Sequence, residues 1–427
     1  MGRIYYQVID ITDFGPYVTK LILGMPRTVK QDEIIPEQFN VYVEIKDLKG
    51  NIVMKPKSFI ERDVFVPSTA YRSIDQVYPC DLKGNKMIEG EYVALEMPYG
   101  PIYPCTSALA ADFSNINGHE SYVNCEYRIT QIQEIGKGDQ ILRGLVFDSC
   151  GKVYNEKKDR FLTGISSYAA LPLRYGYYVP EVNVGKKPLI IFLHGAGEGG
   201  MDLPIAWSGN KVTEFTEKWV QDKFGGAYIL VPQCDTMWMN DGSGVYGTSG
   251  KSMYTKALKA CIDEFIQKNK TMIDTKRVYI GGDSNGGFMT MRMLMSYPKY
   301  FAAAFPICEA MIDRKISDKD IAHLKEIPIW FTHAKNDPVV PPQDYVVPTY
   351  KRLIEAGAKN VHFTFWDKIT DIHAGFKDEK GEPYEYIGHF AWIPMFNDDC
   401  RLDYDGKPVI VEGKEVSLMD WLSLQHK

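Results

Sequence analysis

The stretch RVYIGGDSNGGFM, residues 277–289, decides the fold class of this chain of 427 residues. It places Ser284 between Gly282 and Gly286, which is the pattern G-x-S-x-G. The apolar residues before the glycines are typical of a buried strand, and residues 288–297 after them are typical of a helix. Glycine and serine also form ordinary turns, but a strand that turns sharply into a helix at a serine predicts an exposed nucleophile. The helix N-terminus beside it could stabilise negative charge.

The sequence on both sides of this stretch alternates between strand and helix patterns. Compact apolar runs at 188–193, 227–231 and 327–331 lack polar alternation, which is typical of strands buried on both faces. Residues 252–268 carry one apolar stripe at helical spacing. The alternation predicts an α/β fold with a mostly parallel central sheet and helices on both sides.

The first 150 residues follow a different pattern. Segments such as 39–45 and 123–129 alternate apolar and polar residues, which predicts strands with one buried face. Without a convincing helix pattern, this part is predicted to be an antiparallel β-sandwich. We therefore predict two domains, residues 1–150 and 165–427, joined by a polar stretch at about 150–165.

A second glycine-rich segment, LHGAGEGG at 193–200, directly follows the strand predicted at 188–193. Backbone N–H groups on such a loop can bind the oxyanion of an acyl-transfer reaction. The groups predicted to form this oxyanion hole belong to Ala196, Asn285, Gly195 and Gly197. A phosphate loop is the alternative, but the pattern G-x-x-x-x-G-K-[ST] is absent. We interpret His194 as a structural residue that orients the loop.

A serine nucleophile needs a base that is held by a carboxylate, and the expected chain order is serine, acid, histidine. Asp337 follows the strand predicted at 327–331 and is the predicted acid, in preference to Asp367, Asp371 and Asp378. His389 is the predicted base, with His373 as the alternative; His362 lies in a strand pattern and His426 lies near the C-terminus. The residues expected to contact substrate are Trp238, Trp392 and Glu198.

Charge and cysteine usage limit the partners. The net charge is -6, and basic and acidic residues are interspersed, so we expect neither nucleic acid nor a membrane surface as a partner. The eight cysteines form no CxxC pair; we expect mostly free thiols, while bridges among the four within the first 150 residues stay open. No metal or cofactor is expected. The beginning lacks a secretory apolar region, so the expected location is the cytoplasm, or outside the cell if a signal has been removed.

With these residues assembled, residues 165–427 resemble the α/β-hydrolase superfamily, and within it esterases related to polyhydroxybutyrate depolymerases and feruloyl or acetyl-xylan esterases. The matching segments are LPLRYGYYVPE (171–181), KPLIIFLHGAGEGGMD (187–202), LVPQC (230–234), RVYIGGDSNGGFM (277–289), FAAAFPIC (301–308), IPIWFTHAKNDPVVPP (327–342), GHFAW (388–392) and DWL (420–422). The resemblance implies Ser284, Asp337 and His389 as the catalytic residues and 195–197 as the oxyanion loop. One departure is Asp283, because an anion beside the serine would oppose the oxyanion unless its carboxylate points away.

The first half resembles, less completely, the immunoglobulin-like domain that precedes the catalytic domain in some of these esterases. The resemblance implies a supporting or assembly role, and a homo-oligomer stays open. We expect a serine esterase that acts on acetyl, short-chain acyl or feruloyl esters of small molecules or polysaccharides. A peptidase of the prolyl oligopeptidase type is the alternative, although the first 165 residues are too few for its propeller. A catalytically dead binding protein is the third interpretation.

Overall fold

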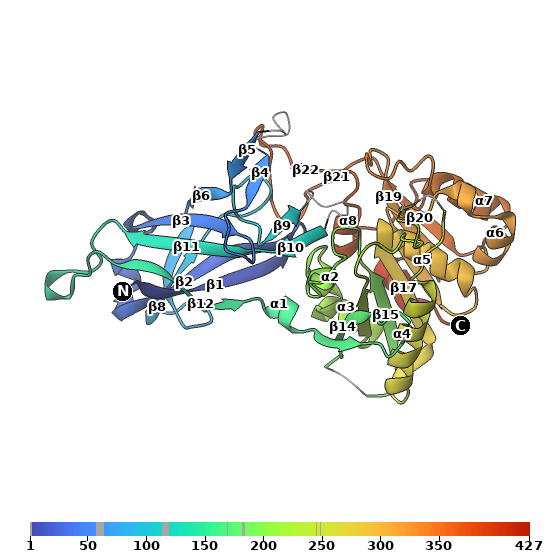
Figure 1. Cartoon of the computed structure of the whole chain (residues 1–427), viewed down its shortest axis with the longest axis horizontal. Helices are drawn as coiled ribbons and strands as arrows, with labels where there is room; N and C mark the ends of the chain where they lie inside the picture. Colours follow the sequence, from blue (N-terminus) through green and yellow to red (C-terminus); the bar gives the residue numbers. More distant parts are fainter. Residues whose placement is uncertain are drawn as a thin grey trace. The chain divides into compact units, whose positions relative to one another are not determined.

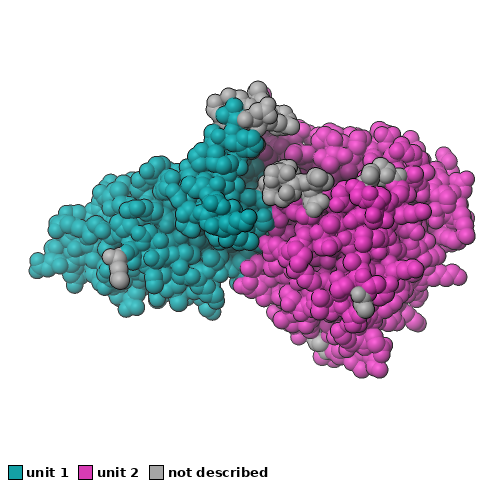
Figure 2. Space-filling model, in the orientation of Figure 1, with its two compact units in different colours: residues 1–110, 121–157 teal, residues 111–120, 158–427 magenta. Residues whose placement is uncertain are grey.

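The computed structural model describes residues 2–56, 64–112, 119–168, 170–181, 184–244, 246–247 and 249–427. The chain forms two compact units, which Figure 2 shows in different colours. The first unit holds residues 1–110 and 121–157, and the second holds 111–120 and 158–427. The division at 157/158 falls inside the polar stretch at 150–165. Sequence patterns gave no sign that residues 111–120 belong with the second unit.

The first unit is built of strands. An eight-stranded sheet has the order β6-β3-β11-β12-β1-β2-β8-β7, in which β1 and β12 pair in parallel while the other neighbours pair antiparallel. The predicted alternation appears as alternating burial along β3, whose apolar side chains join a core with Leu21, Val93 and Phe147. The all-β prediction for this half is confirmed. The strands up to residue 154 are β1 (Arg3–Thr12), β2 (Gly15–Lys30), β3 (Phe39–Lys46), β4 (Met54–Pro56), β5 (Phe65–Pro67), β6 (Thr69–Arg72), β7 (Gln76–Cys80), β8 (Glu89–Glu96), β9 (Leu109–Asp112), β10 (His119–Tyr122), β11 (Asn124–Gln131) and β12 (Val146–Tyr154). Residues 111–112 of β9 and 119–120 of β10 belong to the second unit.

The second unit contains the predicted, mostly parallel sheet, with the order β13-β14-β16-β15-β17-β18-β19-β20. Strands β15 to β20 pair in parallel, and β13 and β14 add an antiparallel edge. The strands of this unit are β13 (Leu162–Ile165), β14 (Arg174–Tyr178), β15 (Lys187–Leu193), β16 (Tyr228–Gln233), β17 (Ile273–Asp283), β18 (Ala303–Ile307), β19 (Ile329–Ala334), β20 (Val361–Trp366), β21 (Ile369–Thr370), β22 (Glu385–Tyr386), β23 (Ile410–Val411) and β24 (Lys414–Glu415).

Both faces of this sheet are covered, as the apolar runs predicted. Leu189 and Ile191 of β15 belong to one large core with side chains from α4, α5 and α7. Figure 1 shows α4 and α5 in front of the sheet. Phe192, on the opposite face of β15, packs with Phe215 and Phe396. The α-helices are α1 (Glu156–Asp159), α2 (Ile205–Ser208), α3 (Lys218–Phe224), α4 (Thr255–Lys268), α5 (Asn285–Ser296), α6 (Asp318–Leu324), α7 (Val346–Glu355), α8 (Trp392–Phe396) and α9 (Leu418–Leu424).

The strand order creates a switch point beside β15. The chain passes from β15 to β16 on one side and then returns to β17 on the other side. Leu193 and Gly282 are register partners at the carboxyl ends of β15 and β17, so the loops after these two strands begin side by side. In open α/β sheets, ligands bind at such a point, outside the carboxyl ends of the strands.

Two further features bear on the expectations from sequence. All eight cysteines are free thiols, and six of them are buried, including Cys234 and Cys308. Within the described ranges, none of the helices has the length and apolar character needed to cross a membrane.

Candidate active site

Ser284 occupies a strained turn between β17 and α5. Its backbone has φ 54° and ψ −113°, a region that non-glycine residues rarely adopt. The turn is held from both sides, because the Ser284 N–H donates to the Ile307 carbonyl at 2.8 Å and its carbonyl accepts from the Phe288 N–H at 2.9 Å. Ser284 is the N-cap of α5, so the N–H of Asn285 belongs to the first turn, where no intrahelical acceptor exists.

Gly286 allows the start of α5 to pack directly on the end of β15. A Cβ atom at this position would lie 1.8 Å from the carbonyl oxygen of Leu193, so no other residue fits without moving the backbone. The close approach brings the N-terminus of α5 beside the loop that begins at His194. The glycine spacing in the motif is therefore explained by contact between two segments about ninety residues apart in the sequence.

Asp337 and His389 meet although 52 residues separate them. Nδ1 of His389 donates to Oδ2 of Asp337 at 2.7 Å, and both side chains are buried. Gly388 makes this possible, since a Cβ at residue 388 would lie 2.3 Å from Oδ1 of Asn336. Because Nδ1 carries the donated proton, Nε2 of the neutral ring is left as the acceptor that a general base requires.

The Asp337 carboxylate is held as an anion by four donors. Oδ1 accepts from the backbone N–H groups of Val339 and Val340 at 2.8 and 3.0 Å, and Oδ2 accepts from His389 and from Nε2 of His333 at 2.9 Å. Burial by itself would raise the pKa of this carboxyl, but the hydrogen bonds from His333 and His389 hold the pKa well below its usual value. The aspartate can therefore stabilise a positively charged His389.

Sequence reasoning missed His333. It is fully buried at the end of β19, and its Nε2 also lies 3.0 Å from the carbonyl oxygen of Val340. The signal was present in FTHAKND, where the histidine stands four residues before the aspartate. Only the loop conformation, which returns Asp337 to the strand end, shows that the two side chains touch.

The other acids and histidines considered from sequence have partners elsewhere. His373 pairs with Asp399 at 2.9 Å and His362 pairs with Asp403 at 2.7 Å. Among the alternative acids, Asp367 pairs with Lys335, while Asp371 and Asp378 accept backbone N–H groups of their own loops. His426 is exposed near the C-terminus. His389 also has an electrostatic interaction with the Asp283 carboxyl, next to Ser284.

The loop after β15 is oriented by His194. Its Nδ1 donates to the Gly195 carbonyl at 2.7 Å, and its Nε2 accepts from the Cys234 N–H at 3.2 Å. Burial lowers the pKa of His194 to about 4, so the ring is neutral and both hydrogen bonds have a fixed direction. These contacts hold the backbone of Gly195 and Ala196 beside the elbow.

The three residues expected to contact substrate lie at two places. Trp238 is fully buried and faces the His194 ring, with the ring centroids 5.0 Å apart. Glu198 is buried behind the loop at 195–197, where its carboxyl approaches Gly195. Trp392 lies at the start of α8 with its ring perpendicular to that of His389. Their contact with substrate stays a prediction, and what the structure shows is packing around the loop and the base.

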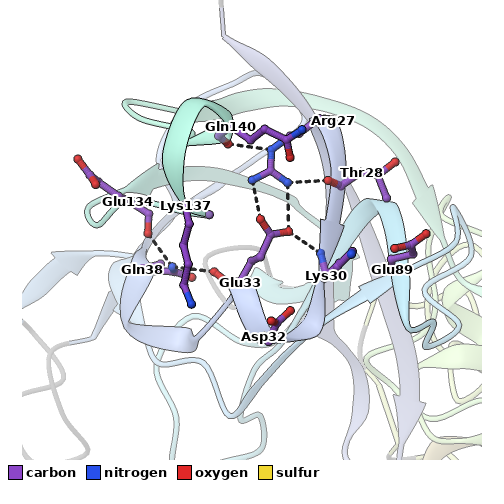
Figure 3. A pocket seen from close by; sticks show the side chains of 11 residues that line it. Arg27, Thr28, Lys30, Asp32, Glu33, Gln38, Glu89, Glu134, Lys137 and Gln140 are labelled. Carbon is purple, nitrogen blue, oxygen red and sulfur yellow. Dashed lines mark hydrogen bonds and ion pairs between the residues drawn. The ribbon is translucent and has the colours of Figure 1, made fainter.

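The first unit holds a separate polar cavity of about 730 Å³, shown in Figure 3. Its guanidinium, Arg27, makes two hydrogen bonds to the Glu33 carboxylate and others to the carbonyls of Thr28 and Gln140. The strongest anion-binding group in the cavity is therefore already occupied, and we assign no site there. Among the residues that the structure describes, no group of three or more His, Cys, Asp or Glu is arranged to hold a metal ion.

The parallel sheet, the strained serine between strand and helix, and the Asp–His pair from two later loops are features of an α/β-hydrolase fold. Residues 178–369 match the family described as Phospholipase/Carboxylesterase, and residues 5–142 match the Esterase Ig-like N-terminal domain. Both family descriptions are those of esterases. The predicted resemblance to these esterases is thereby confirmed.

Individual relatives support the same assignment. Feruloyl esterase B of Neurospora crassa is 31% identical over 137 residues, which are 31% of this chain and 42% of that protein. Poly(3-hydroxyalkanoate) depolymerase C of Paucimonas lemoignei is 29% identical over 157 residues, 34% of each chain. The match therefore spans less than half the length of these relatives. A crystal structure described as a thermostable esterase covers 99% of both chains at 24% identity with a TM-score of 0.72, which shows the shared two-part fold.

Proposed function

We propose that this chain hydrolyses carboxylic esters through a catalytic triad of Ser284, His389 and Asp337. The observation that carries the proposal is the 2.7 Å hydrogen bond between His389 and Asp337, which comes together with a strained serine at the strand-to-helix turn. A base with a fixed tautomer and a serine in an elbow conformation are what nucleophilic ester hydrolysis requires.

The reaction proceeds in two halves. Oγ of Ser284 attacks the ester carbonyl while Nε2 of His389 takes its proton, and the resulting imidazolium is stabilised by the Asp337 carboxylate. The tetrahedral intermediate collapses, the alcohol leaves with the proton from His389, and Ser284 carries the acyl group. Water then attacks the acyl group with His389 again acting as base, which releases the acid and restores the serine.

The negative oxygen of each intermediate would be bound by the N–H of Asn285 and an N–H of the loop at 195–197. Removing one donor of this kind costs about 2.7–4 kcal/mol of transition-state stabilisation. The His194 contacts hold the loop in place before substrate arrives, so little reorganisation is needed during the reaction.

The substrate class follows from the relatives and from the aromatic surroundings of the base. We propose acetyl, short-chain acyl or feruloyl esters of small or polysaccharide-linked alcohols. Trp392 and Phe390 pack with their ring centroids 4.5 Å apart beside His389, and such rings could contact an aromatic acyl group. A series of acetyl, butyryl and feruloyl esters tests this part of the proposal: similar turnover of all three would argue against a feruloyl preference.

The main test compares Ser284→Ala with the wild type on a p-nitrophenyl acyl ester. We expect kcat to fall by about 10⁴-fold or more, because the nucleophile is removed while the fold is kept. Ser423→Ala, in α9, is the matched control, since that hydroxyl donates to the Asp420 carbonyl, away from the proposed triad. Retained activity in Ser284→Ala would refute the proposal. Preference for a peptide amide over the ester would favour the peptidase, and absence of turnover in the wild type would favour the binding protein.

A further inference from the structure

Two carboxyl groups lie against the backbone of the oxyanion loop and are used by none of the steps above. A Cβ built on Gly195 would lie 2.7 Å from Oδ2 of Asp283 and 2.9 Å from Oε2 of Glu198. The side-chain amide of Asn210 donates to Oδ2 of Asp283 at 2.8 Å and also hydrogen-bonds to the Glu198 carboxyl. Asn210 and Gly195 thus connect Asp283, the residue before the proposed nucleophile, with the loop that would bind the oxyanion.

Both carboxyl groups are short of donors. Asp283 and Glu198 are 1% and 5% exposed, and within the described part of the chain neither Oδ1 of Asp283 nor Oε2 of Glu198 has a hydrogen-bond partner. An isolated carboxylate buried without donors is costly, and such a group becomes neutral instead. At least one proton in this pair would supply the missing donor.

The surroundings add negative rather than positive charge. Glu120 at β10, which belongs to the same unit, donates its N–H to the Gly197 carbonyl at 2.7 Å, and its Cγ would lie 3.2 Å from a Cβ at residue 197. Its charge and that of Asp283 act on Glu198. The other titratable groups facing the pair and its loop are His389, the Cys308 thiol, and His119, whose ring contacts the Ala196 carbonyl.

The pKa values of the two carboxyls point in the same direction as the geometry. Burial raises the pKa of Asp283 well above its usual range, against smaller lowering effects of hydrogen bonds and of His389. Burial also raises the pKa of Glu198, and the negative charges of Glu120 and Asp283 raise it further. These directions describe a pair that holds a proton near neutral pH.

We propose that Glu198 and Asp283 form a buried acid pair that positions the oxyanion loop while it keeps a proton, and that losing this proton slows ester hydrolysis. The inference rests on the proposed function, since the loop matters only if an oxyanion forms beside it. Both residues act as positioning residues rather than catalytic ones. When the pair is fully ionised, its charge repels the oxyanion and the two carboxylates repel each other behind Gly195. The loss of kcat should then be of the order of that for one removed oxyanion donor, about 10²- to 10³-fold.

The first test is the dependence of kcat on pH in the wild type and in the double variant Glu198→Gln/Asp283→Asn. Amides keep the shape of the protonated acids but cannot ionise. We expect the wild-type kcat to fall at alkaline pH by at least about tenfold within the accessible range, and the fall to be absent in the double variant. The same alkaline fall in both proteins, or no fall in the wild type, would overturn the proposal.

The second test uses the sign of a charge effect. Glu120→Gln removes a neighbouring negative charge, so the pair should lose its proton more readily and the alkaline fall should begin at lower pH. A purely structural role of the pair predicts no such movement, and an unmoved or raised midpoint would contradict the proposal. Glu309→Gln is the matched control, because Glu309 is a buried acid that packs against Gly287 of α5 instead of Gly195. If this control removed the alkaline fall, the acid pair would not be its cause.

A readout independent of activity separates this inference from the proposed function. The infrared difference spectrum between neutral and alkaline pH should show loss of a protonated carboxyl band in the wild type, and this signal should be reduced in the double variant. An unchanged band in the double variant would overturn the acid pair even in an active esterase. Conversely, a wild type that shows the band but hydrolyses no ester would refute the proposed function and leave the pair with no catalytic effect, which also overturns the inference.

Discussion

Asp337 and the pair formed by Asp283 and Glu198 are equally buried carboxyl groups in the same unit, yet they are in opposite electrostatic situations. Asp337 accepts four hydrogen bonds, two from backbone N–H groups and two from imidazoles. Asp283 and Glu198 share the amide of Asn210 and face a third carboxyl, Glu120. The comparison teaches that the number of donors, more than burial, decides whether a buried carboxyl is charged. The negative charge of Asp337 lies beside the base, where it can stabilise the imidazolium. The pair of Asp283 and Glu198 lies behind the oxyanion loop, where a neutral group does not repel the oxyanion.

The largest expected effect comes from removing the negative charge of Asp337. Asp337→Asn should lower kcat by about 10⁴-fold, because an amide no longer holds His389 in the tautomer with its proton on Nδ1. The measurement is kcat on a p-nitrophenyl acyl ester. Asp367→Asn is the control, since Asp367 is an exposed carboxylate paired with Lys335. Equal losses in the two variants, or little loss in Asp337→Asn, would contradict the role of Asp337.

A smaller effect is expected when the hydrogen bond between His389 and Asp337 is displaced rather than removed. Gly388→Ala places a Cβ 2.3 Å from Oδ1 of Asn336 and close to its backbone, so His389 must shift relative to Asp337. A displacement of about 1 Å at a reacting group costs on the order of 10²-fold in kcat. Circular dichroism should show the same fold as the wild type. Full kcat in Gly388→Ala would mean that the close approach does not position the base.

Glu309 extends the comparison to stability. Its Oε2 accepts from the Met311 N–H at 2.6 Å while Oε1 has no partner among the described residues, and burial raises its pKa from 4.5 to about 8. The folded state therefore binds a proton that the unfolded state has lost, so stability should fall as pH rises from about 4.5 to about 8. This group contributes at most about 1.4 kcal/mol per pH unit. Urea unfolding at several pH values measures this dependence. The free energy of unfolding should fall less steeply with rising pH in Glu309→Gln than in the wild type, and the same pH dependence in both proteins would contradict a buried acid at residue 309.

The smallest effect is expected for an exposed carboxylate with a good partner. Asp222 lies 2.6 Å from Lys218 on α3, where the two side chains are 62% and 88% exposed. Asp222→Asn should lower the free energy of unfolding by only about 0.3–0.5 kcal/mol, and less at high salt. The same urea experiment measures it. A loss comparable to that of a buried group would show that pairing alone, without burial, sets these energies.

The site residues proposed from the sequence rest on local sequence patterns. The motif at Ser284, the loop at 195–197 and the chain order of Asp337 and His389 follow from strand runs and from glycines that permit close approach. The prediction of two domains likewise rests on the change between alternating and continuous apolar runs. These features can be recognised from neighbours a few residues away in the sequence, although the contacts that they make lie between distant segments.

What the sequence could not show depends on segments that meet only in the fold. His333 reaches Asp337 because of the loop conformation after β19, and Glu120 reaches the oxyanion loop from a segment far upstream in the chain. The sequence showed that Asp283 departs from the expected elbow. It could not show that the Asp283 carboxyl accepts a hydrogen bond from Asn210 and lies with Glu198 against Gly195. Burial and donor count, which set the charge of these groups, cannot be read from residue type.

The most direct test of the account is labelling by a fluorophosphonate, which reacts with a serine that its base has activated. Intact mass and peptide mapping should show one adduct on Ser284 in the wild type, none in Ser284→Ala, and a much slower reaction in Asp337→Asn. Absence of an adduct in the wild type, or an adduct on a different residue, would contradict the assignment of Ser284, His389 and Asp337 as a working triad.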